Sequence, residues 1–133
     1  ALNRRYWSHD EKCIRIAQGN IANCLGDLER FDEALVLFRE IYARHLALLG
    51  VSEYTISSGA NLTATLLRME LCGEAKTLLR GQLLPVAQQS LGADHRLTLL
   101  LNENLTAALV GDPAGTRDDL LEAETIMQDV VQR

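Results

Sequence analysis

The chain has 133 residues, which is enough for one domain with its own core and too short for two independent ones. Hydrophobic residues make up 47% of the chain but aromatic residues only 5%, a balance that favours helices packed on helices over a β-rich core. The net charge is -5, and its acidic excess lies in residues 93–133, so the basic stripe that nucleic acid requires is missing.

Other features of the composition bear on the location of the protein. No apolar run approaches the roughly 20 residues of a membrane span, and residues 1–25 carry no signal-peptide pattern. The three cysteines are odd in number and widely spaced, which predicts reduced thiols rather than a disulfide framework. We therefore expect an intracellular protein, most simply a cytoplasmic one, that acts without a membrane.

A stretch of about forty residues occurs three times in the chain. The sequence from position 19 aligns without a gap on the sequence from position 60, at an offset of 41 residues, and a third copy follows with an insertion at 111–115. Self-similarity of this period is typical of repeat arrays, in which each unit buries its apolar face against the next. We divide the chain into residues 1–8, which are an N-terminal extension or the tail of a preceding repeat, and three segments of one domain, 9–50, 51–92 and 93–133. The alignment superposes Asn20, Asn61 and Asn104; Glu33, Glu74 and Glu122; Ala34, Ala75 and Ala123; and Arg39 with Arg80.

Each segment is expected to form two antiparallel helices. Apolar residues follow helical spacing on both sides of a polar turn, which begins at Gly26 in the first segment, and Leu-Gly pairs supply helix stops at Gly50 and Gly92. The predicted helices span 9–27, 30–48, 53–69, 72–90, 95–110 and 117–132. Gly81 and Pro85 interrupt the fourth helix, where proline removes a backbone donor, so we expect a kink or local break between them.

The aligned residues resemble the tetratricopeptide repeat (TPR). Its pattern is matched by Asn-Leu/Ile-Ala/Thr, a polar turn and Glu-Ala, while the Leu-Gly ending and the ADHRLT stretch at 93–98 are similar to the longer, kinesin-light-chain-type repeats of about 42 residues. The resemblance implies an all-α fold, a right-handed α-solenoid of three antiparallel helix hairpins. Thr63 and Thr106 depart from the family pattern, because they replace the small residue expected where helices approach closely.

The aligned asparagines are the main candidate site. In TPR arrays the matching residue lines the concave groove and bonds the backbone of an extended peptide, a task that suits a carboxamide because it is both donor and acceptor. The resemblance therefore implies a protein-protein interaction module, and Glu103 with the acidic third segment favours a basic or neutral peptide. The predicted peptide-binding residues are Asn20, Asn23, Ser57, Asn61, Arg68, Glu103 and Asn104.

Two alternatives stay open. The asparagines could bond neighbouring helices or face water, and the array could be a structural scaffold or an oligomerisation segment of a larger protein, with self-association. No enzyme activity, metal or cofactor is expected. His9, His45 and His95 lack the spacing of zinc ligands, and the glycine-rich stretch at 111–116 lacks the Gly-Lys-Ser/Thr ending of a phosphate loop.

Overall fold

The fold is seen in a computed structural model, which describes residues 20, 21 and 23–132, and in this part of the chain the regular secondary structure is helical. The expectation of an all-α chain is confirmed for these residues. From residue 30 onward, the predicted helices agree with the observed ones within one residue at each end, and most of the predicted helix 9–27 lies outside the described residues. The helical elements after residues 20–27 are α2 (Phe31–Leu49), α3 (Glu53–Arg68), α4 (Cys72–Leu78), the π-helical turn η1 (Leu79–Leu83), α5 (Leu84–Ser90), α6 (Arg96–Gly111) and α7 (Arg117–Gln132).

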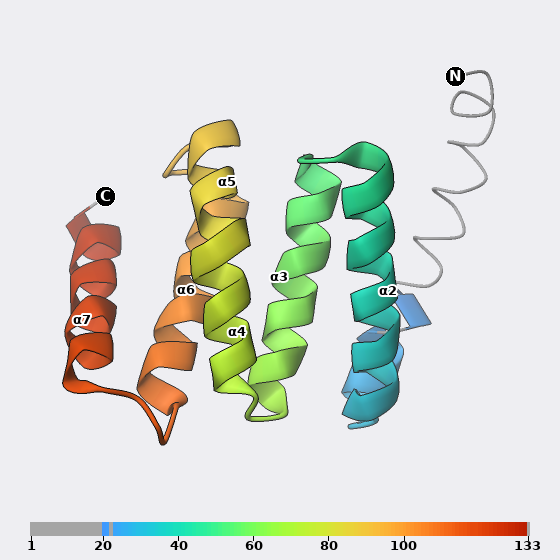
Figure 1. Ribbon diagram of the computed structural model, residues 1–133, viewed down its shortest axis with the longest axis horizontal. Coiled ribbons are helices and arrows are strands. Elements are labelled where there is room, and N and C mark those ends of the chain that lie inside the picture. The colour runs from blue at the N-terminus through green and yellow to red at the C-terminus, as the bar shows by residue number, and fades with distance from the viewer. Residues whose placement is uncertain (1–19, 22, 133) are drawn as a thin grey trace.

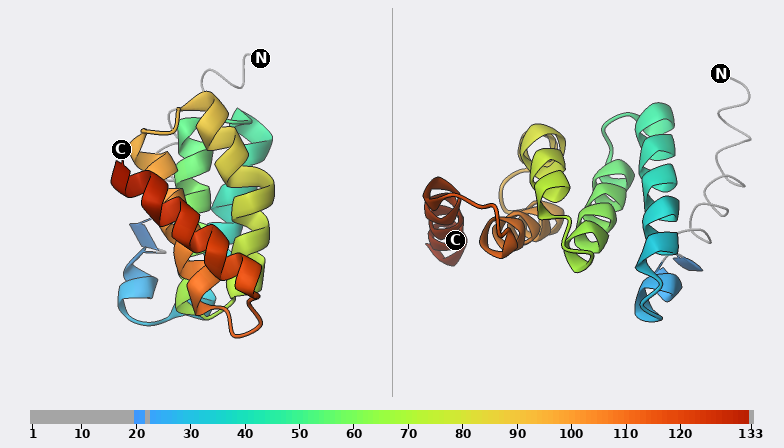
Figure 2. Two further views of the ribbon diagram at one scale, coloured as in Figure 1. Left: turned by 90° about the vertical axis from the view of Figure 1, so that its left-hand side faces the viewer. Right: turned by 60° about the horizontal axis from the view of Figure 1, so that its bottom comes forward.

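The helices stand side by side in a row that runs from α2 to α7 (Figure 1). Helix α2 packs on α3, α3 packs on both α4 and α6, and α6 packs on α4, α5 and α7. Seen from the α7 end, α6 lies on one side of the row and α4 with α5 on the other, while α7 crosses in front of them (Figure 2). The core therefore consists of contacts between elements that are neighbours along the row.

The centre of this row is built from small and aliphatic side chains. The alanines of the three Glu-Ala pairs, Ala34, Ala75 and Ala123, are buried, as are Leu66 and Leu109 on α3 and α6. Because an alanine side chain ends at Cβ, it lets the neighbouring helix approach closely, and the leucines fill the space on either side. Close contact of this kind explains why the same small residue occurs at the aligned positions.

The turns between helices depend on residues in the left-handed region. Gly50 and Gly92 have φ of 60° and 93°, as the Leu-Gly stops predicted. The turn that we placed at Gly26 is formed later, because the helix continues through residue 27. Glu29 and Glu70, which are aligned in the sequence, adopt φ of 61° and 62° instead. The residue after each donates its N–H to a carbonyl five residues back, at 2.7 and 2.8 Å, which satisfies the end of the preceding helix.

The irregularity predicted between Gly81 and Pro85 is a π-helical turn and not a break. The turn spans Leu79–Leu83, and the helix continues on both sides of it. The N–H of Leu84 donates to the carbonyl of Leu79, five residues back. A π-helical turn holds one more residue than an α-helical turn, so it accommodates the single extra residue that the second segment carries.

Candidate functional site

Three of the predicted peptide-binding residues line one surface pocket. The pocket has a volume of about 150 Å³, and it lies between the helical residues 20–27, α2 and α3. Asn23 comes from the first of these elements, while Asn61 and Arg68 come from α3 and are two turns apart on one face. The structure therefore brings Asn23, Asn61 and Arg68 together. The full lining is Asn23, Gly26, Asp27, Phe31, Phe38, Asn61, Ala64, Thr65 and Arg68.

Arg68 is held by an aromatic ring in this pocket. Its guanidinium carbon lies 5.7 Å from the centre of the Phe31 ring, within the range of a cation–π contact. Arg68 is an exposed residue, and the N–H groups of its guanidinium offer a fixed set of donors for carbonyl or carboxylate oxygens. Asp27 lines the same pocket, so the site presents both signs of charge.

Asn61 and Asn104 occupy aligned positions but have different surroundings. Asn61 is exposed on α3 and lines the pocket. Asn104 is half-buried on α6, and its Nδ2 donates to Thr63 Oγ1 at 3.0 Å and to the carbonyl of Ala60 at 3.4 Å. The Thr63 hydroxyl in turn donates to the same carbonyl at 3.0 Å. The amide of Asn104 thus connects α6 to α3 by hydrogen bonds. This arrangement corresponds to the alternative that an asparagine bonds a neighbouring helix.

The other predicted residues lie outside the pocket lining. Ser57 is half-buried on α3, one turn before Asn61, and Glu103 is exposed on α6. Asn20 is exposed at the start of the described helical residues. Since α3 packs on α6, Ser57, Asn61 and Glu103 belong to neighbouring helices.

Sequence reasoning missed the aromatic floor of the pocket. Phe31 and Phe38 follow the apolar spacing of a helix face, which predicts packing on a neighbouring helix, yet both also line the pocket. Asp27 was missed as well, although the 41-residue offset aligns it with Arg68 and could have drawn attention to it. The two charged residues come from aligned positions of two segments and line the same pocket.

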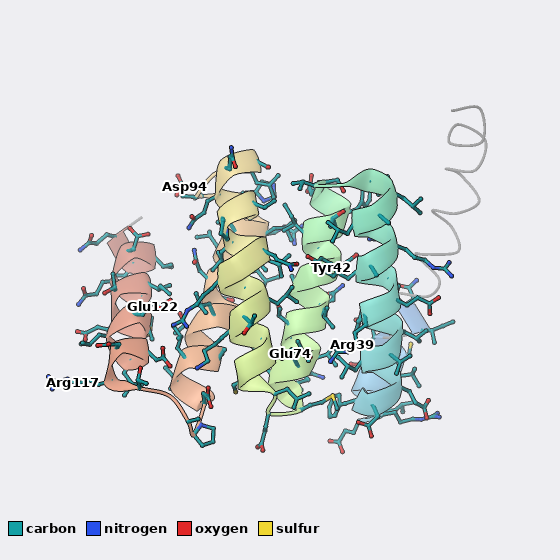
Figure 3. All side chains as sticks on the ribbon, in the orientation of Figure 1. Arg39, Tyr42, Glu74, Asp94, Arg117 and Glu122 are labelled. Carbon is teal, nitrogen blue, oxygen red and sulfur yellow. The ribbon has the colours of Figure 1, made fainter. Side chains whose placement is uncertain are left out.

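A second set of charged residues joins α2, α4 and α7 on another side of the row. Arg39 of α2 pairs with Glu74 of α4 at 2.6 Å (Figure 3). Arg80 of η1 pairs with Glu122 of α7. The alignment superposes the two arginines and also the two glutamates. Each arginine thus reaches the glutamate of the following segment. The first pair is exposed, so its contribution to stability is small.

Lys76 is the centre of a less exposed ion-pair cluster between α4 and α7. Its Nζ lies 2.6 Å from Asp112 and 3.1 Å from Asp119, and these bonds raise the pKa of the Lys76 ammonium. The bond from Arg80, followed by those from Lys76 and the backbone N–H of Thr116, lowers the pKa of Asp119 to about 2. The ammonium of Lys76 and the carboxylates of Asp112 and Asp119 are consequently charged near neutral pH. The ion pair between Lys76 and Asp119 joins α4 to α7.

A mainly apolar pocket of about 300 Å³ lies beside the π-helical turn. Tyr42 from α2 and Gln82 from the turn both line it, and the Tyr42 hydroxyl donates to Gln82 Oε1 at 3.1 Å. Burial raises the pKa of the Tyr42 hydroxyl, which therefore remains protonated at neutral pH. None of the predicted peptide-binding residues lines this pocket, and the hydrogen bond connects α2 to the fourth helix at its irregular point.

Among residues 20, 21 and 23–132 no group of three histidine, cysteine, aspartate or glutamate side chains is placed to hold a metal ion. In the same part of the chain, every helix is too short or too polar to cross a membrane. Comparisons with protein-family models, with curated proteins and with solved structures give no match.

Proposed function

We propose that the chain is a TPR-like array, a right-handed solenoid of three helix hairpins, that binds an extended peptide along its concave face. The similar turns at Glu29 and Glu70 and the aligned buried alanines support the repeated hairpin. The array is non-enzymatic in this proposal, and its resemblance to kinesin-light-chain-type repeats rests on the aligned sequence alone.

The pocket that contains Asn23, Asn61 and Arg68 carries the proposal. The carboxamides of Asn23 and Asn61 offer donors and acceptors to the backbone of a bound segment. The Arg68 guanidinium, which lies over Phe31, donates hydrogen bonds to a carbonyl or a carboxylate of that segment. Asp27 and Glu103 select basic or neutral side chains further along the segment. Asn104 contributes by holding α6 against α3, because its Nδ2 already has acceptors within the fold.

The proposal can be tested with a peptide library displayed on phage and selected against the full chain. We expect the selected peptides to lose at least about tenfold in affinity for Asn61→Ala and for Arg68→Ala, since each change removes a polar contact in the pocket. Glu40→Ala is the matched control, because Glu40 is also exposed on the surface but does not line the pocket. Unchanged affinity of all selected peptides for both pocket variants would refute this site.

The alternative proposal is a scaffold or oligomerisation segment, and the ion pairs between successive segments favour it. These pairs stabilise the array without any ligand. Sedimentation analysis would support this function if the chain forms a stable dimer and the library yields no binder. A monomer with selected binders would support the peptide-binding function.

A further inference from the structure

One side of α7 exposes a row of apolar side chains. Leu120, Met127 and Val131 are exposed to 54%, 47% and 85%, and their spacing places them with Glu124 along one face of the helix. We call these four residues the outer stripe of α7. The helix lies at the end of the row (Figure 2), and among the described elements it packs mainly on α6.

The same positions on α2 are covered by α3. Aligning Glu33 with Glu122 superposes the outer stripe on Phe31, Leu35, Phe38 and Tyr42. Phe38 and Tyr42 are exposed to only 3% and 9%, against 47% and 85% for Met127 and Val131. Helix α3 packs on α2, and the Arg68 guanidinium of α3 lies over the Phe31 ring. Phe38 and Tyr42 line pockets together with Asn61 and Ile56 of α3.

The fourth helix repeats this relation with α6. Cys72 is aligned with Phe31 and Leu120, and it is buried beside Gly111, where an added Cβ would lie 3.8 Å from the cysteine sulfur. Leu79 is aligned with Phe38 and Met127, and it is fully buried. In the first two segments, most of these positions are therefore buried, and the first helix of the following segment packs on the helix that carries them.

From this comparison we propose that the outer stripe of α7 binds a helix of a partner protein, which packs on it as α3 packs on α2. The position of Glu124 defines the chemistry of that helix. The aligned residue in the second segment is Lys76, which is half-buried and paired with Asp112 and Asp119. A helix laid over Glu124 would bury a carboxylate, and this is favourable only if the helix brings a lysine or arginine to it.

The partner helix thus has a face of small and apolar residues with a basic residue near its middle. Helix α7 of a second copy of this chain is a poor occupant of the stripe. Helix α7 carries five acidic residues, Asp118, Asp119, Glu122, Glu124 and Asp129, against the single base Arg117 within its bounds, so two such helices would repel one another. The proposal concerns a surface separate from the pocket of Asn61 and Arg68, and it does not depend on peptide binding there.

Two synthetic peptides derived from α3 can test the proposal. Both span residues 52–71, are held helical by a lactam bridge on the solvent side, and differ by Ala64→Lys or Ala64→Glu. On α2, Leu35 corresponds to Glu124 and lies between Phe31 and Phe38 among the positions aligned with the stripe. Ala64 is chosen because it lines a pocket together with Phe31 and Phe38. Fluorescence anisotropy of the labelled peptides is measured with the full chain and with its variants.

We expect the Ala64→Lys peptide to bind the wild-type chain at least about tenfold more tightly than the Ala64→Glu peptide, because it pairs with Glu124. Glu124→Lys should reverse this order. Met127→Arg should abolish binding of both peptides, while Glu40→Ala, at an exposed position of α2 outside the stripe and the pocket, should leave it unchanged. Absence of binding, or binding without the charge reversal, would overturn the proposal. A dimer of the free chain that Met127→Arg dissociates would overturn it in favour of self-association.

Discussion

Asn61 on α3 and Asn104 on α6 occupy the same position in two successive segments, yet one is exposed at a pocket and the other bonds a neighbouring helix. The difference lies in the preceding segment. Asn104 donates to the hydroxyl of Thr63, whereas the residue aligned with Thr63 in the first segment is Ala22, which carries no hydroxyl. The hydroxyl of Thr63 therefore gives Asn104 a hydrogen-bond partner within the fold, and the aligned Ala22 has no such group for Asn61.

The largest expected effect comes from breaking this partnership at Thr63. Thr63→Val should lower the free energy of unfolding by about 2 kcal/mol, because it removes a fully buried hydroxyl that accepts from Asn104 and donates to a carbonyl. Urea unfolding measures the change. Thr106→Val is the matched control at the aligned, half-buried position, and we expect it to cost less than about 0.5 kcal/mol. Equal losses in the two variants would contradict the role of Thr63.

The two asparagines themselves should differ by a smaller amount. Asn104→Ala should cost about 1 kcal/mol, since it removes the hydrogen bonds between α6 and α3, while Asn61→Ala on the exposed surface should stay within about 0.5 kcal/mol. Thermal unfolding of both variants in parallel measures the difference. A larger loss for Asn61→Ala would show that the exposed asparagine also holds the fold together.

In contrast to the asparagines, the turns at Glu29 and Glu70 are alike in the two segments. Glu70→Gly should stabilise the chain by about 0.5 to 1 kcal/mol, because glycine adopts the left-handed conformation without the strain that a side chain adds. Glu29→Gly should give a similar gain. The control Ala64→Gly lies in an exposed part of α3 and should cost about 1 kcal/mol. A loss of stability in both turn variants would argue for a role of the glutamate side chains.

The smallest effects are expected at the ion pairs, and pH separates the two sets. The pKa of Asp119 is lowered to about 2 from its ordinary value near 4, so its contribution is fully present above pH 4 and is lost as the pH falls through about 2. Asp119→Asn should remove this part of the acid sensitivity, which thermal midpoints between pH 2 and 6 would measure. Glu74→Gln, in the exposed pair with Arg39, should change the midpoint little at neutral pH. An unchanged acid profile in Asp119→Asn would contradict the assignment.

The sequence predicted the helices well because their apolar spacing, glycine stops and offset agree with one another. It also aligned Arg39 with Arg80 and Glu74 with Glu122, but the alignment alone did not reveal that each arginine pairs with the glutamate of the next segment. That fact depends on how the helices stack. In the same way, the outcome for Asn104 could not be read from its own segment, since the deciding residue lies 41 positions earlier.

The π-helical turn was predictable as a disturbance but not in its form. Gly81 and Pro85 indicated where the α-helix would be irregular. The one-residue surplus of the second segment indicated that an extra residue had to fit into its helices. Whether the helix breaks, bends or widens depends on the neighbouring helices. Here the turn lies where Gln82 accepts a hydrogen bond from Tyr42 of α2, a partner 40 residues away.

In both ion pairs, the arginine of one segment contacts the glutamate of the next segment, so the two ends of a segment carry different partners. The second segment carries both partners, Glu74 toward α2 and Arg80 toward α7, so a duplicated second segment would present each copy with a compatible neighbour. In the third segment the position of the arginine is taken by Gln128, which bears no charge. Duplication of the middle segment would therefore keep both ion pairs, whereas a segment placed after the third would find no arginine at the position of Gln128.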